Sequence, residues 1–272
     1  MSEPTITRQT IIEALGAAVE AAPFVRAAWL GGSDATGRTD RWSDIDLQLV
    51  AEDDRIEETY ACVHDALEGL SPIELRYRFP MPTWHGHEQE ILKLAGSDPW
   101  SIIDLVIIAR SHPDRFLERE RHGEPRVLLD RDGLVVPAAL DRDAHLARLQ
   151  ARLATLRVTF PLFQSFATKA ALRGHTADAL QSYQAFTMRP LIELLRMRHC
   201  PERFDYGARY LDRDLPEALR EEIETLVLVP ALEELESRRQ RAATLFDAQI
   251  RALDAGEWSP ERALDSRLAP GR

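Results

Sequence analysis

The most informative stretch of this chain is Leu30-Gly31-Gly32-Ser33, followed a short distance later by Asp44-Ile45-Asp46-Leu47. The apolar residues 24–30 predict a buried strand. Two consecutive glycines let the backbone turn sharply and let a ligand come close. Ser33 is then placed to cap the start of a helix, where free N–H groups attract phosphate. Side chains alternate along a strand, so we expect Asp44 and Asp46 on one face.

Two carboxylates beside an anion-binding turn can hold Mg²⁺ bridged to a nucleoside triphosphate. The alternative interpretation is that Asp-x-Asp is a solvated strand end and Gly-Gly-Ser an ordinary turn. The order and spacing of the two elements favour the functional interpretation.

This pattern resembles the signature of the nucleotidyltransferase superfamily, whose fold is that of DNA polymerase β. Gly37, Arg38 and Ser43 further resemble the small bacterial aminoglycoside nucleotidyltransferases, such as kanamycin nucleotidyltransferase. The resemblance is specific over residues 24–108 and architectural elsewhere. It implies that the nucleotide contacts the following residues: Gly31, Gly32, Ser33, Arg38 and Ser43. It also implies that Asp44 and Asp46 hold one or two Mg²⁺ ions.

A third carboxylate, Asp104, interrupts the apolar residues 100–108. An unpaired charge on a central strand costs roughly several kcal/mol. In the family a third carboxylate lies on such a strand beside the first pair. The resemblance therefore assigns Asp104 to the site, as a metal ligand or as the base that activates the acceptor hydroxyl. The alternative is a hydrogen-bonded structural aspartate.

Periodicity predicts that residues 1–140 form a mixed-sheet domain, and that the whole chain is of the α+β class. Helices are expected over residues 7–21, 56–70 and 115–121. Strands are expected over residues 43–50, 73–79, 88–94, 100–108, 127–130 and 134–136. Strict alternation in residues 73–79 predicts a half-buried strand.

Residues 141–272 predict a helical bundle that forms a second domain. Helical segments are expected over residues 146–156 and 160–173, the latter with Gly174 as a C-cap. Thr176 is expected to cap a helix that runs to about His199 and is kinked at Pro190. Two more helices are expected over residues 217–229 and 230–255, and residues 256–272 as a loose tail.

The two-part layout is similar to that of kanamycin nucleotidyltransferase and its relatives, whose active site lies between sheet and bundle. The resemblance implies that Lys169 reaches the triphosphate, with Arg173 on the same helix face. The alternative is a solvated basic edge. Glu74, Glu88 and Glu90 are candidates for binding an amine of the acceptor.

The composition excludes several other classes of protein. With 45 acidic against 34 basic residues and a net charge of −11, the 272-residue chain is poorly suited to extended nucleic acid and favours a cationic partner. Two cysteines make no disulfide framework. His85-Gly86-His87 lacks a third ligand for zinc. The chain shows neither a signal segment nor a membrane-length apolar run, so a cytoplasmic protein is expected. The oligomeric state is open.

The sequence thus predicts an enzyme that moves a nucleoside monophosphate, AMP from ATP, to a hydroxyl of a small molecule. The family resemblance points to a cationic, aminoglycoside-type acceptor. One alternative is a protein adenylyltransferase of the toxin–antitoxin type; its helical ribonuclease partner carries an Arg/His spacing that residues 141–272 lack. Another is a non-catalytic nucleotide-binding protein, which has no need of Asp44, Asp46 and Asp104.

Overall fold

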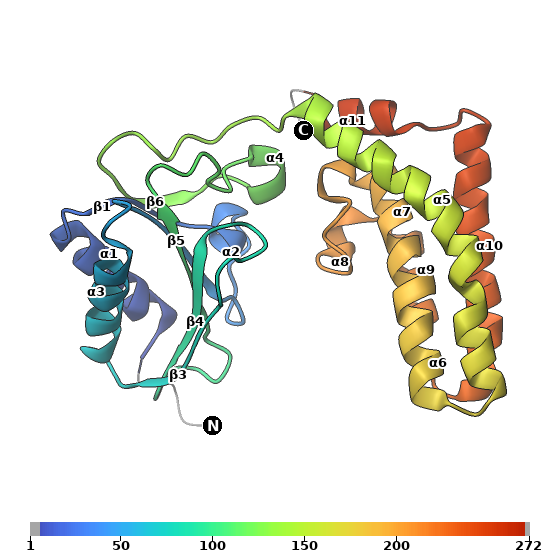
Figure 1. The fold of residues 1–272 in the computed structure, drawn as a ribbon, viewed down its shortest axis with the longest axis horizontal. Coiled ribbons are helices and arrows are strands. Elements are labelled where there is room, and N and C mark those ends of the chain that lie inside the picture. Colours follow the sequence, from blue (N-terminus) through green and yellow to red (C-terminus); the bar gives the residue numbers. More distant parts are fainter. Residues whose placement is uncertain (1–5, 270–272) are drawn as a thin grey trace. The chain divides into compact units, whose positions relative to one another are not determined.

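The computed structural model describes residues 6–269 of the chain, which divides into two compact units (Figure 1). Unit 1 is Met1–Ala139 and unit 2 is Leu140–Arg272. Unit 1 holds a six-stranded mixed sheet with helices, and unit 2 is helical. The predicted α+β class is therefore confirmed.

The strands of unit 1 follow the order β3-β4-β5-β2-β1-β6 across the sheet. Their bounds are β1 Val25–Leu30, β2 Ile45–Ala51, β3 Ile73–Arg78, β4 Glu88–Leu94, β5 Ile103–Ala109 and β6 Arg126–Asp130. The central strands β2 and β5 pair in parallel, and the other pairs are antiparallel. Nearly continuous apolar runs form β2 and β5 because both faces of these strands are largely covered.

The helices of unit 1 are α1 Arg8–Ala21, α2 Gly32–Ala35, α3 Ile56–Glu68 and α4 Arg119–His122. Helix α1 begins where the Thr7 side chain accepts a hydrogen bond from the Thr10 N–H. Buried residues of α1 and α3 pack on one face of the sheet (Figure 1). The opposite face has a smaller apolar cluster that includes Trp29, Val50 and Val106. Because side chains alternate along each strand, Asp46 and Asp104 share the face of Val50 and Val106.

Three expectations for unit 1 are wrong. Strand β3 is an exposed edge strand, with Leu75 63% and Tyr77 57% exposed, because neither face of its middle is covered. Residues 134–136 form no strand; the Asp130 carboxylate accepts hydrogen bonds from the N–H groups of Leu134 and Val135 at 2.8 and 3.1 Å. In place of the helix expected over residues 115–121, the structure has only the four-residue helix α4, Arg119–His122.

Unit 2 consists of helices of very different length. They are α5 Arg142–Leu172, α6 Thr176–Tyr183, the π-helix η1 Gln184–Met188, α7 Arg189–His199, the 3₁₀-helix η2 Pro201–Arg203, α8 Leu211–Asp214, α9 Glu217–Val227, α10 Leu232–Asp254 and α11 Pro260–Leu268. The two segments expected over residues 146–173 are one helix that runs through Pro161. Gly174 follows its C-terminus with a φ of +72°, as expected of a glycine there.

Near Pro190, where a kink is expected, residues Gln184–Met188 form the π-helix η1 directly before α7. Proline lacks an N–H, so the Phe186 carbonyl loses its helical donor. The Gln164 side chain supplies one instead, at 3.0 Å. Thr176 is the first residue of α6, and its expected capping role is wrong, since His175 is the N-cap.

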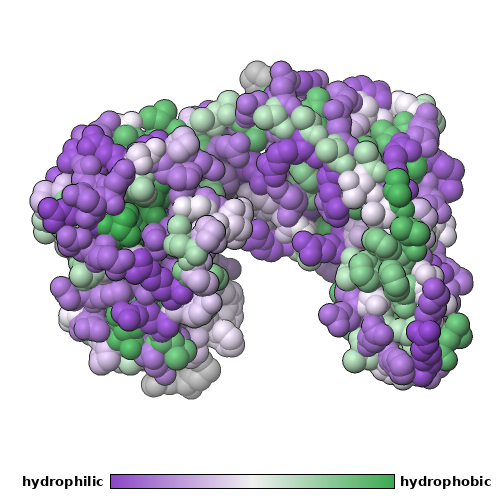
Figure 2. Space-filling view, in the orientation of Figure 1, coloured by the Kyte–Doolittle hydropathy of each residue, from purple (hydrophilic) through white to green (hydrophobic). Residues whose placement is uncertain are grey.

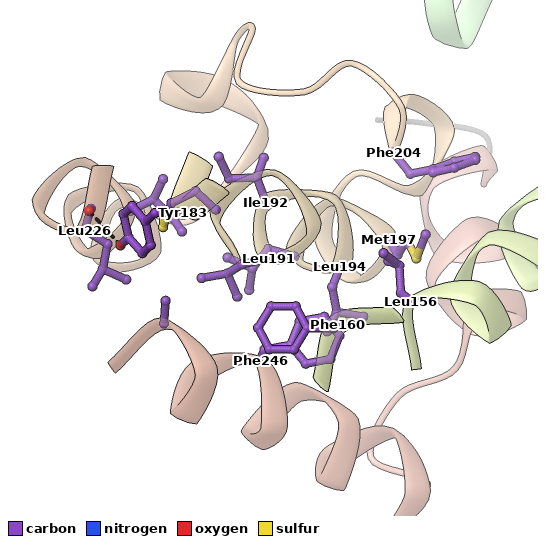
Figure 3. Packing of buried hydrophobic residues seen from close by; sticks show 14 of the residues in the cluster. Leu156, Phe160, Tyr183, Leu191, Ile192, Leu194, Met197, Phe204, Leu226 and Phe246 are labelled. Carbon is purple, nitrogen blue, oxygen red and sulfur yellow. Dashed lines mark hydrogen bonds between the residues drawn. The ribbon is translucent and has the colours of Figure 1, made fainter. Parts of the chain in front are cut away.

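The core of unit 2 joins residues that are far apart in the sequence (Figure 3). Phe160 stacks on Phe246 with 3.6 Å between ring centroids, and the Tyr183 hydroxyl donates to the Leu226 carbonyl at 2.9 Å. Trp258 and Leu264 are buried as well. The tail prediction is therefore wrong over residues 260–268, which form α11; residues 270–272 lie outside the described residues.

Hydrophobic side chains also gather on the exposed surface of unit 2 (Figure 2). Helix α5 contributes Val158, Leu162 and Phe166, which are 65%, 63% and 47% exposed. The helix thus carries apolar residues on an exposed face as well as a buried one, which blurs its amphipathic pattern.

Candidate functional site

Asp46 and Asp104 lie opposite each other in the register of the parallel strands β2 and β5. Neighbouring strands are ~4.8 Å apart, so the two carboxylates lie side by side on the face away from α1 and α3. Burial, together with the charges of Asp104, Asp44 and Asp34, raises the pKa of Asp46 to about 6. Burial also raises the pKa of Asp104. A hydrogen bond from Gln89 lowers this pKa, but by less than burial raises it. The arrangement repels further negative charge unless a cation is present.

Asp44 precedes β2 and is more exposed than the other two carboxylates. Partial burial of its carboxyl still raises its pKa, while the Ile102 N–H and the charge of Arg8 lower it. Asp44 contributes to the raised pKa of Asp46, so the three carboxylates are electrostatically coupled.

The donor set fits magnesium shared with a phosphate group. Within residues 6–269, no group of three or more His, Cys, Asp or Glu side chains is arranged to hold a metal ion, and this includes His85 and His87. The paired oxygens of Asp46 and Asp104 are the hard donors that Mg²⁺ prefers, and Mg²⁺ commonly takes one or two protein carboxylates and completes its shell with water and substrate phosphates. A metal set of Asp44, Asp46 and Asp104 stays a prediction.

The glycine turn packs directly against β2. The Gly31 N–H donates to the Asp46 carbonyl at 2.9 Å, and Gly32 has a φ of +52°. A Cβ atom on Gly32 would overlap Asp46 Oδ2, and one on Gly31 would lie 2.7 Å from Gln48 Oε1. In this structure, therefore, the glycines make room for side chains of the adjacent strand, above all the Asp46 carboxylate.

Ser33 does not cap α2, so that expectation is wrong. The N-cap is Gly31, and α2 is four residues long. The Ser33 hydroxyl is buried and has no hydrogen-bond partner among the described residues. A buried polar atom without a partner is costly, and a ligand oxygen could satisfy it.

The other residues expected at the nucleotide are in different situations. Ser43 closes its own loop: its hydroxyl accepts from the Asp40 N–H and donates to Asp40 Oδ1, both at 2.9 Å. Arg38 is exposed and forms no ion pair with any described residue, Asp40 included. Lys169 and Arg173 are exposed at the end of α5 in unit 2. Nucleotide binding by these four residues stays a prediction.

Arg8 is a residue of the site that sequence reasoning missed. It forms an ion pair with Asp34, whose side chain is 3% exposed, and donates to the Asp44 carbonyl at 2.9 Å. Arg126 adds a second cation 3.4 Å from Asp34. Asp34, directly after the Gly-Gly-Ser turn, indicates in the sequence that a cationic partner is needed there. No nearby residue identifies Arg8 or Arg126 as that partner.

The glutamates expected to bind an amine lie elsewhere. Glu90 contacts His64 of α3 at 2.6 Å and is 2% exposed, so it faces the helix side of the sheet. Glu88 shares that face and pairs with Arg78 at 2.9 Å. Glu74 is exposed on the edge strand β3. The expectation that these residues line the site of Asp46 is wrong for Glu88 and Glu90, because alternation along β4 turns them to the opposite face.

Comparison with known proteins identifies the class of this site. Residues 11–95 match the family model of the nucleotidyltransferase domain. The matched residues include the glycine turn, Asp44 and Asp46, and end before Asp104. Unit 1 therefore carries a nucleotidyltransferase domain, and the chain is an enzyme of the nucleotidyltransferase class, as predicted.

No curated protein matches the chain. Among solved structures, the crystal structure of an aminoglycoside 6-adenyltransferase from Bacillus subtilis is similar to 97% of this chain and 92% of that chain, at 14% sequence identity and a TM-score of 0.33. A score of this size does not establish a shared fold, so the family model carries the assignment.

Replacing Gly32 with alanine tests the packing of the turn against Asp46. The new Cβ atom must displace the Asp46 carboxylate, so we expect kcat to fall on the order of tenfold or more. Gly37→Ala is the matched control, because Gly37 also has a positive φ, of +65°, but a Cβ atom there meets open space. Equal losses in the two variants would show that backbone strain, and not the carboxylate, is responsible.

Proposed function

We propose that the enzyme transfers a nucleoside monophosphate, AMP from ATP, to a hydroxyl group of a small polar molecule. The observation that carries this proposal is the in-register pair of Asp46 and Asp104 beside the glycine turn. Paired carboxylates on one strand face suit a reaction in which charge develops around one phosphorus atom.

In the proposed reaction, the acceptor oxygen forms a bond to the α-phosphorus as the bond to the bridging oxygen breaks and pyrophosphate leaves. Asp46, with Asp44 or Asp104, would hold Mg²⁺, which would neutralise charge at the phosphates. Asp104 orients the acceptor hydroxyl and takes its proton, and its raised pKa makes it a stronger base than an exposed aspartate. The Ser33 hydroxyl and the N–H groups of the turn hold phosphate oxygens.

The proposed acceptor is a small cationic molecule of the aminoglycoside type. The chain has 45 acidic and 34 basic residues, and negative potential draws ammonium groups toward a protein. Attraction of this kind weakens as salt rises, since exposed charges are screened over about 10 Å at 0.1 M. A cationic acceptor should therefore lose kcat/KM as the salt concentration increases.

Pyrophosphate release tests the proposed function. The full chain is incubated with Mg²⁺, each of the common nucleoside triphosphates in turn, and a panel of aminoglycosides, neutral alcohols and proteins. We expect release to need both Mg²⁺ and an acceptor, with a mass increase of one nucleotidyl group on that acceptor. No release with any acceptor would contradict the proposed transfer. If proteins were the only acceptors labelled, the proposed acceptor would be a protein and not a small molecule.

Lys169→Ala tests the role of the bundle. If Lys169 contacts the triphosphate, we expect the KM for ATP to rise about tenfold with a smaller change in kcat, because the lost contact is made in both ground and transition states. Arg148→Ala is a control on the same helix, since its guanidinium pairs with Asp205 at 2.9 Å. Unchanged nucleotide kinetics would show that Lys169 does not contact the triphosphate and is a solvated surface residue.

A further inference from the structure

A chain of hydrogen bonds ends on Asp104. Gln89 of β4 donates from Nε2 to Asp104 Oδ1 at 2.8 Å. Its Oε1 atom lies 3.2 Å from His85 Nε2. The three side chains thus connect the loop before β4 to the carboxylate on the central strand β5.

The contacts of His85 Nδ1 at the far end favour one polarity of this chain. The backbone N–H of His87 donates to His85 Nδ1 at 3.1 Å, and the Thr83 hydroxyl lies 3.2 Å from the same atom. The backbone donor favours the neutral ring in which Nδ1 carries no proton. Nε2 then carries the proton and donates to Gln89 Oε1. The carboxamide is left with one orientation that satisfies both neighbours, with its NH₂ group toward Asp104.

The imidazole of His85 is also held by packing. Its ring centroid lies 4.9, 5.2 and 5.4 Å from the rings of Trp84, His87 and Phe116. His87 is 2% exposed, and burial lowers its pKa to about 4, so it is a neutral part of this wall. Trp84 is 90% exposed, so the contacts that hold the His85 ring are those with His87 and Phe116. A ring packed in this way keeps Gln89 in place more firmly than a free side chain would.

We propose that Gln89, oriented by His85, is the positioning residue for Asp104. By occupying Oδ1, it leaves Oδ2 as the carboxylate oxygen that faces the acceptor hydroxyl. The inference rests on the proposed function, because it assigns these residues to the proton transfer of that reaction. Sequence reasoning placed neither residue in this role.

The test uses two variants and their combination in the full chain. Gln89→Met keeps the length of the side chain and removes the hydrogen bonds, so we expect kcat to fall on the order of 10- to 100-fold while the Kd for ATP, measured without acceptor, changes little. His85→Phe keeps the ring packing and removes the donor, and a smaller loss is expected. The double variant should be no worse than Gln89→Met, because the two residues act through one path.

His112→Phe is the matched control. Its ring lies 4.3 Å from that of His87, in the same cluster but outside the hydrogen-bond chain, so kcat should not change. A second readout needs no turnover: the ¹³C resonance of the Asp104 side-chain carboxyl, assigned by its absence in Asp104→Asn. This resonance should shift in Gln89→Met, shift less in His85→Phe, and stay in place in His112→Phe.

The two readouts separate the inference from the proposed function. An unshifted carboxyl resonance in Gln89→Met, normal kcat in that variant, or additive losses in the double variant would overturn the positioning role. A wild-type enzyme without pyrophosphate release, but with the expected pattern of shifts, would overturn the proposed function and leave the orientation of Asp104 by Gln89 standing.

Discussion

Replacing Asp46 with asparagine should lower kcat/KM for the proposed nucleotidyl transfer by about 100-fold or more. The variant keeps the shape of the side chain but removes one of the two carboxylates that face each other across β2 and β5. In the proposed reaction, both cation binding and the stabilisation of charge at the phosphates would depend on that carboxylate. The measurement is steady-state pyrophosphate release. Glu68→Gln at the exposed end of α3 is the control and should retain full activity.

The same variant should be more stable than the wild type at neutral pH. The pKa of Asp46 is raised to about 6, so the folded protein binds this proton more tightly than the unfolded chain does. The free energy of unfolding therefore falls as pH rises from about 4 to about 6. Above that range the ionised carboxylate lowers the free energy of unfolding by roughly 3 kcal/mol, a cost that asparagine does not carry.

Thermal unfolding in EDTA checks this result. At about pH 7.5 the Tm of Asp46→Asn should exceed that of the wild type, and at about pH 3 the two should converge because the wild-type carboxyl is then largely protonated in both the folded and the unfolded state. A variant that is inactive and also less stable at both pH values would show that Asp46 is a structural residue.

Arg196→Met should unfold unit 2 far more easily than the wild type. The guanidinium is fully buried and lies 2.7 Å from Asp214, and it also donates to the carbonyl groups of Gly207, Arg203 and Arg209. Burial would raise the pKa of Asp214, but Arg203 and Arg196 hold it below its ordinary value. Removing Arg196 leaves a buried carboxylate with one partner fewer, at a cost of roughly 3–5 kcal/mol.

Urea unfolding of the full chain, followed by helical circular dichroism, measures this loss. Arg157→Met is the control: its pair with Asp254, at 2.6 Å, lies at the surface and should contribute less than about 1 kcal/mol. If both variants shift the unfolding midpoint equally, Arg196 is not what holds residues 200–214 in place.

Much of unit 1 could be predicted from the sequence because its elements are short and strongly periodic. The strands that became β1, β2, β4 and β5 and the helices α1 and α3 were expected within a few residues of their bounds. The exposure of β3 was not predictable from its alternation, because alternation tells which residues share a face and not whether another element covers that face. Likewise, α5 continues through Pro161, which a local pattern reads as a break.

The motif Gly-Gly-Ser with Asp-x-Asp was enough to indicate the class of enzyme, and the family model confirms that class. The contacts that shape the site come from elsewhere in the chain. Arg8 reaches Asp34 from α1, and Gln89 reaches Asp104 from β4. Each joins segments whose proximity depends on strand order, which no short motif encodes.

The parallel register of β2 and β5 has a consequence for how this enzyme can change over time. Backbone hydrogen bonds set the distance between the strands that carry Asp46 and Asp104, so substitutions in the surrounding loops need not alter it. Loops tolerate variation better than the strands that they connect. In the proposed reaction, the spacing of the two carboxylates is therefore set by the main chain, and substitutions in the surrounding loops can accumulate without changing it.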